Sequence, residues 1–177
     1  MTDGERFVPS DSDFTEIMVN LERYFYAMHY CKDKVVIDAG CGSGLGTYLF
    51  SLVAKKIYAV DYEELETLGS LLKYPLKCPV EWLKRDLDTD ILPEADVCVA
   101  LEVIEHLKHP DFFLKNLKVK ELVFSIPRES LAVSTWHVQD FRTFDDIKAF
   151  LEDYMTVETY HTQYNKWLYG VGVFTNK

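Results

Sequence analysis

The sequence predicts an α/β fold, a doubly wound sheet that is mostly parallel and ends in a C-terminal antiparallel hairpin. Short apolar runs alternate with amphipathic segments over residues 35–127. This alternation is typical of right-handed βαβ units whose parallel sheet is covered on both faces. Two β-branched and aromatic runs follow, at residues 154–161 and 165–175, and their short polar separation favours a hairpin.

Length and composition indicate an ordinary globular protein. The chain has 177 residues, of which 48% are hydrophobic and 27% charged, so one domain with a folded core is expected. We expect this domain to span residues 1–177, with residues 1–12 flexible. The net charge of −10 disfavours a broad nucleic-acid surface, because phosphates would be repelled. Nucleic acid is therefore not an expected partner.

The expected location is the cytoplasm. No apolar stretch follows a basic end at the N-terminus, so no signal peptide is predicted. The most apolar stretch, residues 35–54, contains Asp38 and four glycines, and we expect no membrane span. The four cysteines lack CxxC or CxxH spacing, so they are expected to be reduced and mostly buried. The oligomeric state is left open.

The predicted elements follow one another without long gaps. The first is a helix over residues 16–31, capped by Asp11 or Ser12, with apolar side chains at helical spacing. These side chains are Ile17, Leu21, Tyr24, Phe25 and Met28. The later elements, in order, are strand 35–38, helix 45–54, strand 56–61, helix 63–72, strand 80–86, strand 96–102, helix 103–118, strand 121–127 and a helix capped by Thr143.

A glycine loop between the first strand and its helix is the first candidate site. It runs from Asp38 to Gly44 as DAGCGSG, and its glycines permit a tight turn and close approach of a ligand. Such a loop alone can also be a plain turn. However, Asp61 closes the second strand, where a carboxylate can accept hydrogen bonds from ribose hydroxyls. Asp86 closes the third strand, and Leu87 after it is suited to an adenine edge.

On these residues, the chain resembles the class I S-adenosylmethionine-dependent methyltransferases. VVIDAGCGSG is similar to their DxGxGxG strand and loop, and the elements match their Rossmann-like, seven-stranded sheet. The resemblance implies S-adenosylmethionine as cofactor and S-adenosylhomocysteine as product. Asp38 would order the loop, Asp61 would hold the ribose, and Asp86 would meet the adenine. The implied cofactor-binding residues are Asp38, Gly40, Cys41, Gly42, Gly44, Asp61, Tyr62, Asp86, Leu87 and Leu101.

Two acids and two histidines form the second candidate site. Glu102, Glu105 and His106 are spaced i, i+3, i+4, which on a helix places them on one face at the carboxyl edge of the sheet. His137 lies in an aperiodic segment, 128–144, whose length suggests an active-site loop. We expect the four side chains to converge beside the cofactor's methyl group. The alternative is a charged helix face that only meets water.

The chemistry of this second site has two possible forms. In the first, His106 or His137 is a general base that deprotonates the methyl acceptor. In the second, Glu102, Glu105, His106 and His137 bind a divalent metal. The ExxEH pattern resembles the ubiquinone-biosynthesis type of O-methyltransferase. With the later histidine, it also resembles the small-RNA 3′-end 2′-O-methyltransferases, whose set binds magnesium or manganese. The metal-free form is favoured.

The expected function is therefore methyl transfer to a hydroxyl oxygen of a small molecule, whose identity the sequence does not give. Tyr24, Tyr26, His29 and Trp136 are candidate walls of its pocket, although packing in the core would also explain each. Three alternatives stay open. They are a metal-dependent 2′-O-methyltransferase acting on RNA, a cofactor-binding module without activity, and a nicotinamide-dependent oxidoreductase that uses the same glycine loop.

Overall fold

A computed structural model describes residues 14–63, 75–128 and 137–174. Four earlier predictions fall outside these described residues: the flexibility of residues 1–12, the helix caps Asp11 and Ser12, residues 64–72 of one helix, and Trp136 as a pocket wall. The chain divides into two compact units, Met1–Arg85 and Asp86–Lys177. The single domain expected over the whole chain stays a prediction.

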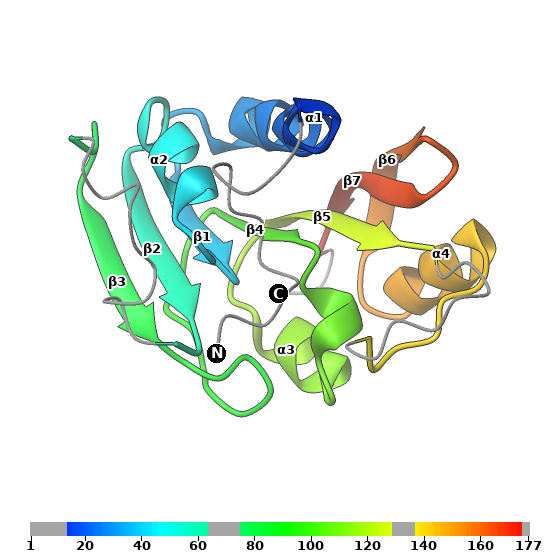
Figure 1. Ribbon diagram of the computed structural model, residues 1–177. Helices are drawn as coiled ribbons and strands as arrows, with labels where there is room; N and C mark the ends of the chain where they lie inside the picture. The colour runs from blue at the N-terminus through cyan, green and yellow to red at the C-terminus, as the bar shows by residue number, and fades with distance from the viewer. Residues whose placement is uncertain (1–13, 64–74, 129–136, 175–177) are drawn as a thin grey trace. The chain divides into compact units, whose positions relative to one another are not determined.

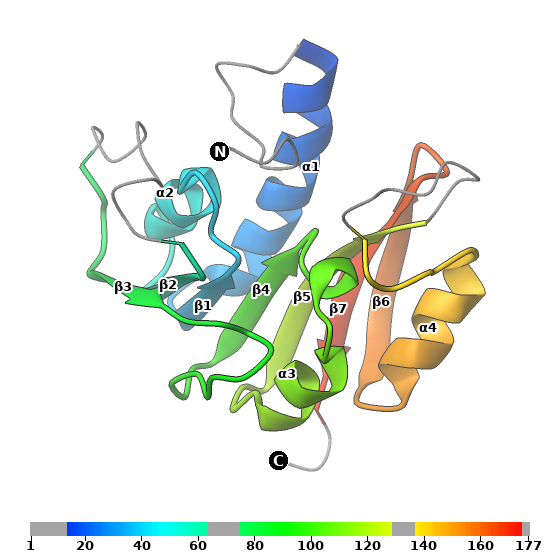
Figure 2. The same ribbon diagram turned by 60° about the horizontal axis from the view of Figure 1, so that its bottom comes forward.

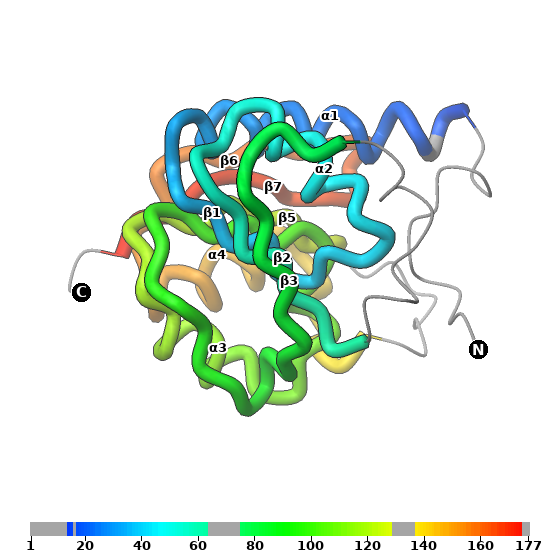
Figure 3. The backbone as a smooth tube through the Cα atoms, turned by 90° about the vertical axis from the view of Figure 1, so that its left-hand side faces the viewer, coloured from blue at the N-terminus to red at the C-terminus, as the bar shows by residue number. Residues whose placement is uncertain are grey.

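The first unit is built on parallel strands. β1 (Val35–Ala39) pairs with β2 (Lys56–Asp61), and β2 pairs with β3 (Val80–Lys84), so these strands lie in the order β3-β2-β1 (Figure 3). Helix α2 (Leu45–Ser51) contacts β2 and also α1 (Phe14–Cys31), as can be followed in Figure 1. Both β1 and β2 are mostly buried, as their apolar runs predict.

Helix α1 buries a different face from the one predicted. Its buried side chains are Val19, Arg23, Ala27 and Cys31, spaced four residues apart along one stripe. Phe25, which the predicted apolar face included, is 55% exposed. The buried Arg23 guanidinium donates to the Asn20 side chain at 2.8 Å, so a polar residue occupies this stripe.

The second unit combines parallel and antiparallel pairs. β4 (Val97–Leu101) pairs in parallel with β5 (Glu121–Pro127). β5 pairs antiparallel with β7 (Trp167–Val173), and β7 pairs antiparallel with β6 (Thr156–Gln163). Figure 2 shows these strands in the order β4-β5-β7-β6, with α4 (Phe144–Glu152) against β6 and β7.

The predicted fold class is confirmed: the described residues form seven strands of an α/β, Rossmann-like fold, mostly parallel with the C-terminal hairpin. The bounds predicted for strands 56–61 and 121–127 agree with β2 and β5. The threonine cap of α4 is also confirmed, because Thr143 accepts from the Asp146 N–H at 3.1 Å in a capping box. Among the described helices, none is both long and apolar enough to span a bilayer.

The predicted helix over residues 103–118 is wrong. The chain instead forms a short 3₁₀ turn, η3 (Ile104–His106), continues through an extended Leu107, and begins α3 (Pro110–Asn116) only at the proline. Proline disfavours helical geometry in the residue before it and is well suited to a first helical position. Helix α2 also ends at Ser51, three residues before its predicted end at Ala54.

The hairpin requires glycine where β7 passes an irregularity in β6. The register of β6 against β7 shifts between Val157 and Thr159, as at a β-bulge. A side chain at Gly170 would collide with the Thr159 carbonyl and would lie 2.9 Å from the Tyr160 Cα. Both neighbours are backbone, so they cannot move aside without disturbing the pairing.

We expect Gly170→Ala to lower the free energy of unfolding by about 3 kcal/mol, as overpacking against fixed backbone does. Gly172→Ala is the matched control on the same strand. Its new methyl group would meet mainly the flexible side chain of Met155, so we expect a cost of about 1 kcal/mol. Urea unfolding of both variants measures the difference, and equal costs would contradict the role given to the bulge.

Candidate functional site

The glycine loop connects β1 to α2 in the first unit. Gly42 and Gly44 have φ values of 52° and 83°, a left-handed conformation that favours glycine over other residues. The loop is tied to β2, because the Cys41 N–H donates to the Val60 carbonyl at 2.9 Å. The Gly44 N–H donates to the Cys41 carbonyl at 2.9 Å, which closes the turn before the helix. The loop therefore has a defined backbone shape.

Asp61 fixes this shape from the end of β2. Its Oδ2 accepts the Gly42 N–H at 2.9 Å, and its Oδ1 accepts the Glu63 N–H at 3.1 Å. The residue is 8% exposed. The Asp61 carboxylate is thus bonded directly to the glycine loop. Its role toward a ribose stays a prediction.

Asp38 lies buried beneath the start of α2. The Thr47 hydroxyl donates to its Oδ2 at 2.5 Å. Burial raises the pKa of the Asp38 carboxyl from its ordinary 3.8 to about 7, with the Thr47 hydrogen bond acting in the opposite direction and the Asp61 charge adding to the rise. Sequence reasoning missed Thr47, because only the fold brings it to the carboxylate.

Asp86 and Leu87 begin a tight turn in the second unit. Asp86 is exposed, and its Oδ1 accepts the Asp88 N–H at 2.9 Å, while Leu87 is buried. The Asp88 carboxylate accepts the N–H groups of Lys108 and His109 at 3.2 and 2.7 Å. The turn is therefore attached to the segment that follows the ExxEH residues. The predicted adenine contact of Asp86 and Leu87 is untested.

The other residues expected at the cofactor differ in exposure. Tyr62 is 65% exposed just after β2, and Gly40 is also exposed. Cys41 is buried, and Leu101 is half-buried at the end of β4. Their predicted contacts with the cofactor remain untested.

Glu102 is directed toward β5 and β7. It has a left-handed φ of 56°, unusual for a residue with a side chain. Its carboxylate accepts the Ser125 hydroxyl and the Trp167 indole N–H, both at 2.7 Å. The predicted one-face arrangement of Glu102, Glu105 and His106 is wrong, because it required a continuous helix and the chain turns sharply at Glu102. Ser125 and Trp167 were not foreseen, since they come from distant strands.

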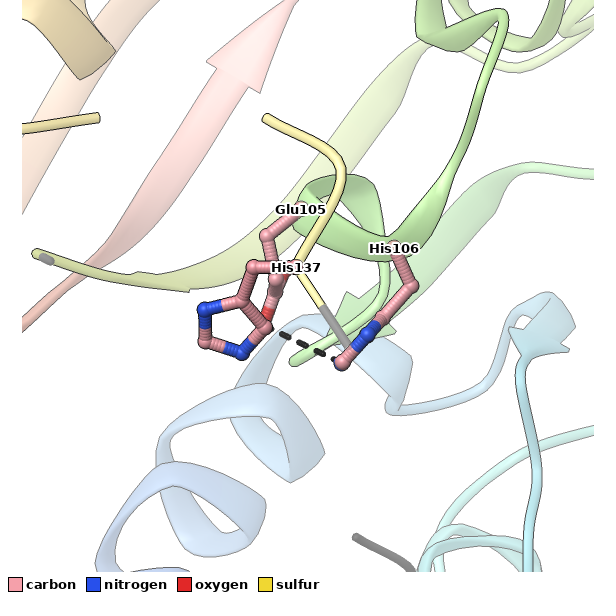
Figure 4. Close-up of side chains that lie close together, drawn as sticks. All are labelled: Glu105, His106 and His137. Atoms are coloured by element: carbon pink, nitrogen blue, oxygen red, sulfur yellow. Dashed lines mark ion pairs between the residues drawn. The ribbon is translucent and has the colours of Figure 1, made fainter. Parts of the chain in front are cut away.

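Glu105, His106 and His137 do come together (Figure 4). One potential ligand atom from each lies within 4.8 Å of the others. The two imidazole rings have centroids 4.9 Å apart at an angle of 70°. His106 Nε2 lies 3.8 Å from Glu105 Oε1. Glu105 is buried, whereas both histidines are partly exposed, so the rings can meet a substrate or an ion.

Backbone hydrogen bonds bring His137 to this cluster. The N–H groups of Val138 and Gln139 donate to the Glu105 carbonyl at 2.8 and 3.0 Å. The Gln139 side chain donates to the Leu107 carbonyl at 2.8 Å. Sequence reasoning did not single out Gln139, because its partners are carbonyl groups and no residue pattern marks them.

Sequence comparison finds methyltransferases. Residues 37–119 match the family model described as "Methyltransferase domain". A "Probable S-adenosylmethionine-dependent methyltransferase" of Mycobacterium tuberculosis is 34% identical over 115 residues, which cover 59% of this chain and 38% of that protein. A ribosomal protein L11 methyltransferase of Acinetobacter baumannii is 40% identical over 75 residues, covering 39% and 25% respectively. The chain thus spans well under half the length of these relatives.

Solved structures show the same fold over most of the chain. A SAM-dependent methyltransferase from Aquifex aeolicus has a TM-score of 0.74 at 21% identity, covering 96% of this chain and 100% of that one. The methyltransferase domain of bacterial CtHen1-C has a TM-score of 0.71 at 20% identity, covering 88% and 98%. Over residues 37–119 in sequence, and over most of the chain in fold, this protein is therefore similar to S-adenosylmethionine-dependent methyltransferases.

We expect Asp61→Ala to weaken binding of S-adenosylhomocysteine by about 1–3 kcal/mol, or roughly 5- to 150-fold in Kd. The variant loses the acceptor that shapes the loop at Gly42 as well as the predicted ribose contact. Glu81→Ala is the control, because it removes an exposed acid from β3 in the same unit. Calorimetry measures both affinities, and an unchanged Kd in a folded Asp61 variant would remove the assignment.

We expect Asp38→Asn to change how stability depends on pH. Because the folded state holds the Asp38 proton up to about pH 7, the wild type loses stability as pH rises from about 4 to 7. The asparagine variant cannot ionise in this range and lacks this loss. The free energy of unfolding of the variant minus that of the wild type should therefore rise by about 4 kcal/mol between pH 4 and pH 7. Urea unfolding at several pH values measures the gain. Asp153→Asn, which removes an exposed carboxylate, is the control, and parallel curves for Asp38→Asn and the wild type would refute the expectation.

Proposed function

We propose that this chain transfers the methyl group of S-adenosylmethionine to a hydroxyl oxygen of a small molecule. The observation that carries the proposal is the pair of imidazoles, His106 and His137, beside the buried carboxylate of Glu105 in a methyltransferase fold. A hydroxyl is a poor nucleophile until its proton is removed, and imidazole is suited to remove it near neutral pH.

The proposed step is a single displacement. The hydroxyl proton moves to an imidazole nitrogen of His106 or His137, and the oxygen attacks the methyl carbon. The carbon–oxygen bond forms as the carbon–sulfur bond breaks, and the sulfur leaves as the neutral thioether of S-adenosylhomocysteine. Alignment and exclusion of water contribute most to the rate of such a step.

The Glu105 carboxylate supports the general-base role. An imidazole that accepts a proton becomes a cation, and a carboxylate nearby stabilises that cation. Glu105 Oε1 lies 3.8 Å from His106 Nε2, and the carboxylate is 1% exposed, so water screens the attraction only weakly. His137, whose ring meets His106 edge to face, offers a second nitrogen base to the same acceptor.

Cofactor binding is proposed for the glycine loop and the acids after it. Asp61 would accept the ribose hydroxyls while it braces Gly42, and Asp86 with Leu87 would meet the adenine. Asp38 would keep the loop and the start of α2 together through Thr47. The supporting likeness is of fold, and it includes an N-methyltransferase NodS solved with S-adenosylhomocysteine (TM-score 0.69, 17% identity).

A metal-dependent reaction on the 2′-hydroxyl of RNA is the second candidate. It is favoured by the closeness of one carboxylate and two imidazoles, a donor set that suits Mn²⁺ better than Mg²⁺. In this reading, the metal would lower the pKa of the hydroxyl and orient it. Glu102 is a weaker fourth ligand than the sequence suggested, because Ser125 and Trp167 already bind its carboxylate. The net charge of −10 also disfavours RNA.

The test is turnover with methyl-labelled S-adenosylmethionine, a panel of phenols, catechols and hydroxy acids, and a short RNA with a free 2′-hydroxyl at its 3′ end. We expect label in a small molecule and activity that survives EDTA, because a histidine acting as general base needs no metal. The double variant His106→Ala, His137→Ala should lose at least about 100-fold in kcat.

Other outcomes of the same assay separate the alternatives. Label in RNA alone, loss of activity with EDTA and recovery with Mn²⁺ would establish the metal-dependent candidate, and Glu105→Gln would then mimic EDTA. Binding of S-adenosylhomocysteine without any turnover would indicate a module without activity. Undiminished turnover in the folded double histidine variant would reject both chemical roles of the histidines.

A further inference from the structure

The segment that carries His106 has little regular structure of its own. Between β4 and α3, only η3 (Ile104–His106) is helical, and Leu107 is extended with φ −75° and ψ 137°. A residue in such a short turn is not held by a helical ladder of hydrogen bonds. The position of the His106 ring therefore depends on contacts from outside the segment.

Gln139 makes two of these contacts, one on each side of His106. Its backbone N–H donates to the Glu105 carbonyl at 3.0 Å, and its side-chain amide donates to the Leu107 carbonyl at 2.8 Å. Glu105 and Leu107 are the immediate neighbours of His106, so one residue brackets the histidine along the chain. The Gln139 side chain is half-buried, so its bond to Leu107 is shielded in part from water.

Gln139 also belongs to the segment that carries His137, two residues earlier. The hydrogen bonds of Gln139 on either side of His106 therefore also fix the position of His137. The Val138 N–H contributes to this, because it donates to the Glu105 carbonyl at 2.8 Å. We propose that Gln139 is a positioning residue that holds the two imidazoles in their edge-to-face arrangement, 4.9 Å apart. An effect of Gln139 on catalysis rests on the function proposed above. The arrangement of the two imidazoles can be tested without measuring turnover.

Asp88 provides a matched control for this proposal. It holds the same segment at its other end, where its carboxylate accepts the N–H groups of Lys108 and His109. Both bonds go to backbone beyond His106, and neither involves the segment of His137. Loosening the segment at Asp88 should therefore affect local stability without separating the two rings.

The test compares Gln139→Leu with Asp88→Asn by NMR in protein labelled at histidine. Leucine keeps a similar size and loses the amide that bonds the Leu107 carbonyl. In the wild type we expect a nuclear Overhauser cross-peak between the ring protons of His106 and His137, since the ring centroids are 4.9 Å apart. Gln139→Leu should weaken this cross-peak several-fold, and Asp88→Asn should keep it.

Kinetics and binding complete the test. Because a displacement of about 1 Å in a reacting group can cost up to about 100-fold, we expect Gln139→Leu to lower kcat by about 10- to 100-fold. The Kd for S-adenosylhomocysteine should stay within about twofold, which a general loss of structure would not allow.

Three results would overturn the proposal. They are an intact cross-peak in Gln139→Leu, an unchanged kcat, and a fall in cofactor affinity that parallels the fall in kcat. If the wild type binds S-adenosylhomocysteine but methylates no acceptor, the proposed function fails. The cross-peaks of the two variants would still decide whether Gln139 positions the rings.

Discussion

The hydrogen bond from the Gly42 N–H to the Asp61 carboxylate is the constraint on which the candidate cofactor site depends. It joins the glycine loop to the end of β2, while the Cys41 N–H makes a second connection to Val60. The arrangement places the buried carboxyl of Asp38 under the influence of the Asp61 charge, and burial raises the Asp38 pKa to about 7. The hydrogen bond from the Thr47 hydroxyl opposes part of this rise, because it stabilises the ionised carboxylate. A loop shaped by backbone and buried acids is set before a ligand arrives, which lowers the entropy lost on binding.

The histidine cluster of the second unit is held in place by a different kind of contact. Its side chains come from a short turn and from a segment without regular structure, so their positions rest on bonds to single carbonyl groups. Glu102 occupies a left-handed conformation at the start of this turn, and Ser125 and Trp167 hold its carboxylate. Unusual backbone conformations of this kind persist only where neighbouring groups fix them. After this turn, Glu105 and His106 lie close to His137.

The sequence predicted what depends on local pattern. Apolar runs predicted the strands β2 and β5 at their observed bounds, with Asp61 at the end of β2, and Thr143 and Asp146 marked the start of α4. The prediction of one helix through His106 was wrong because it relied on the helical spacing of the side chains. It gave too little weight to Pro110, which disfavours helical geometry in the residue before it. Thr47, Ser125, Trp167 and Gln139 were not predicted, because their partners belong to other structural elements or are backbone atoms. Such contacts follow from tertiary packing, and no spacing rule encodes them.

The central claim is that the glycine loop and Asp61 serve S-adenosylmethionine and not a dinucleotide. Calorimetric titration of the wild-type protein with S-adenosylhomocysteine and, separately, with NAD⁺ tests it most directly. The structure and the comparisons lead us to expect saturable binding of one S-adenosylhomocysteine per chain and no heat of binding with NAD⁺. Saturable binding of NAD⁺, or no binding of S-adenosylhomocysteine by folded protein, would contradict the claim.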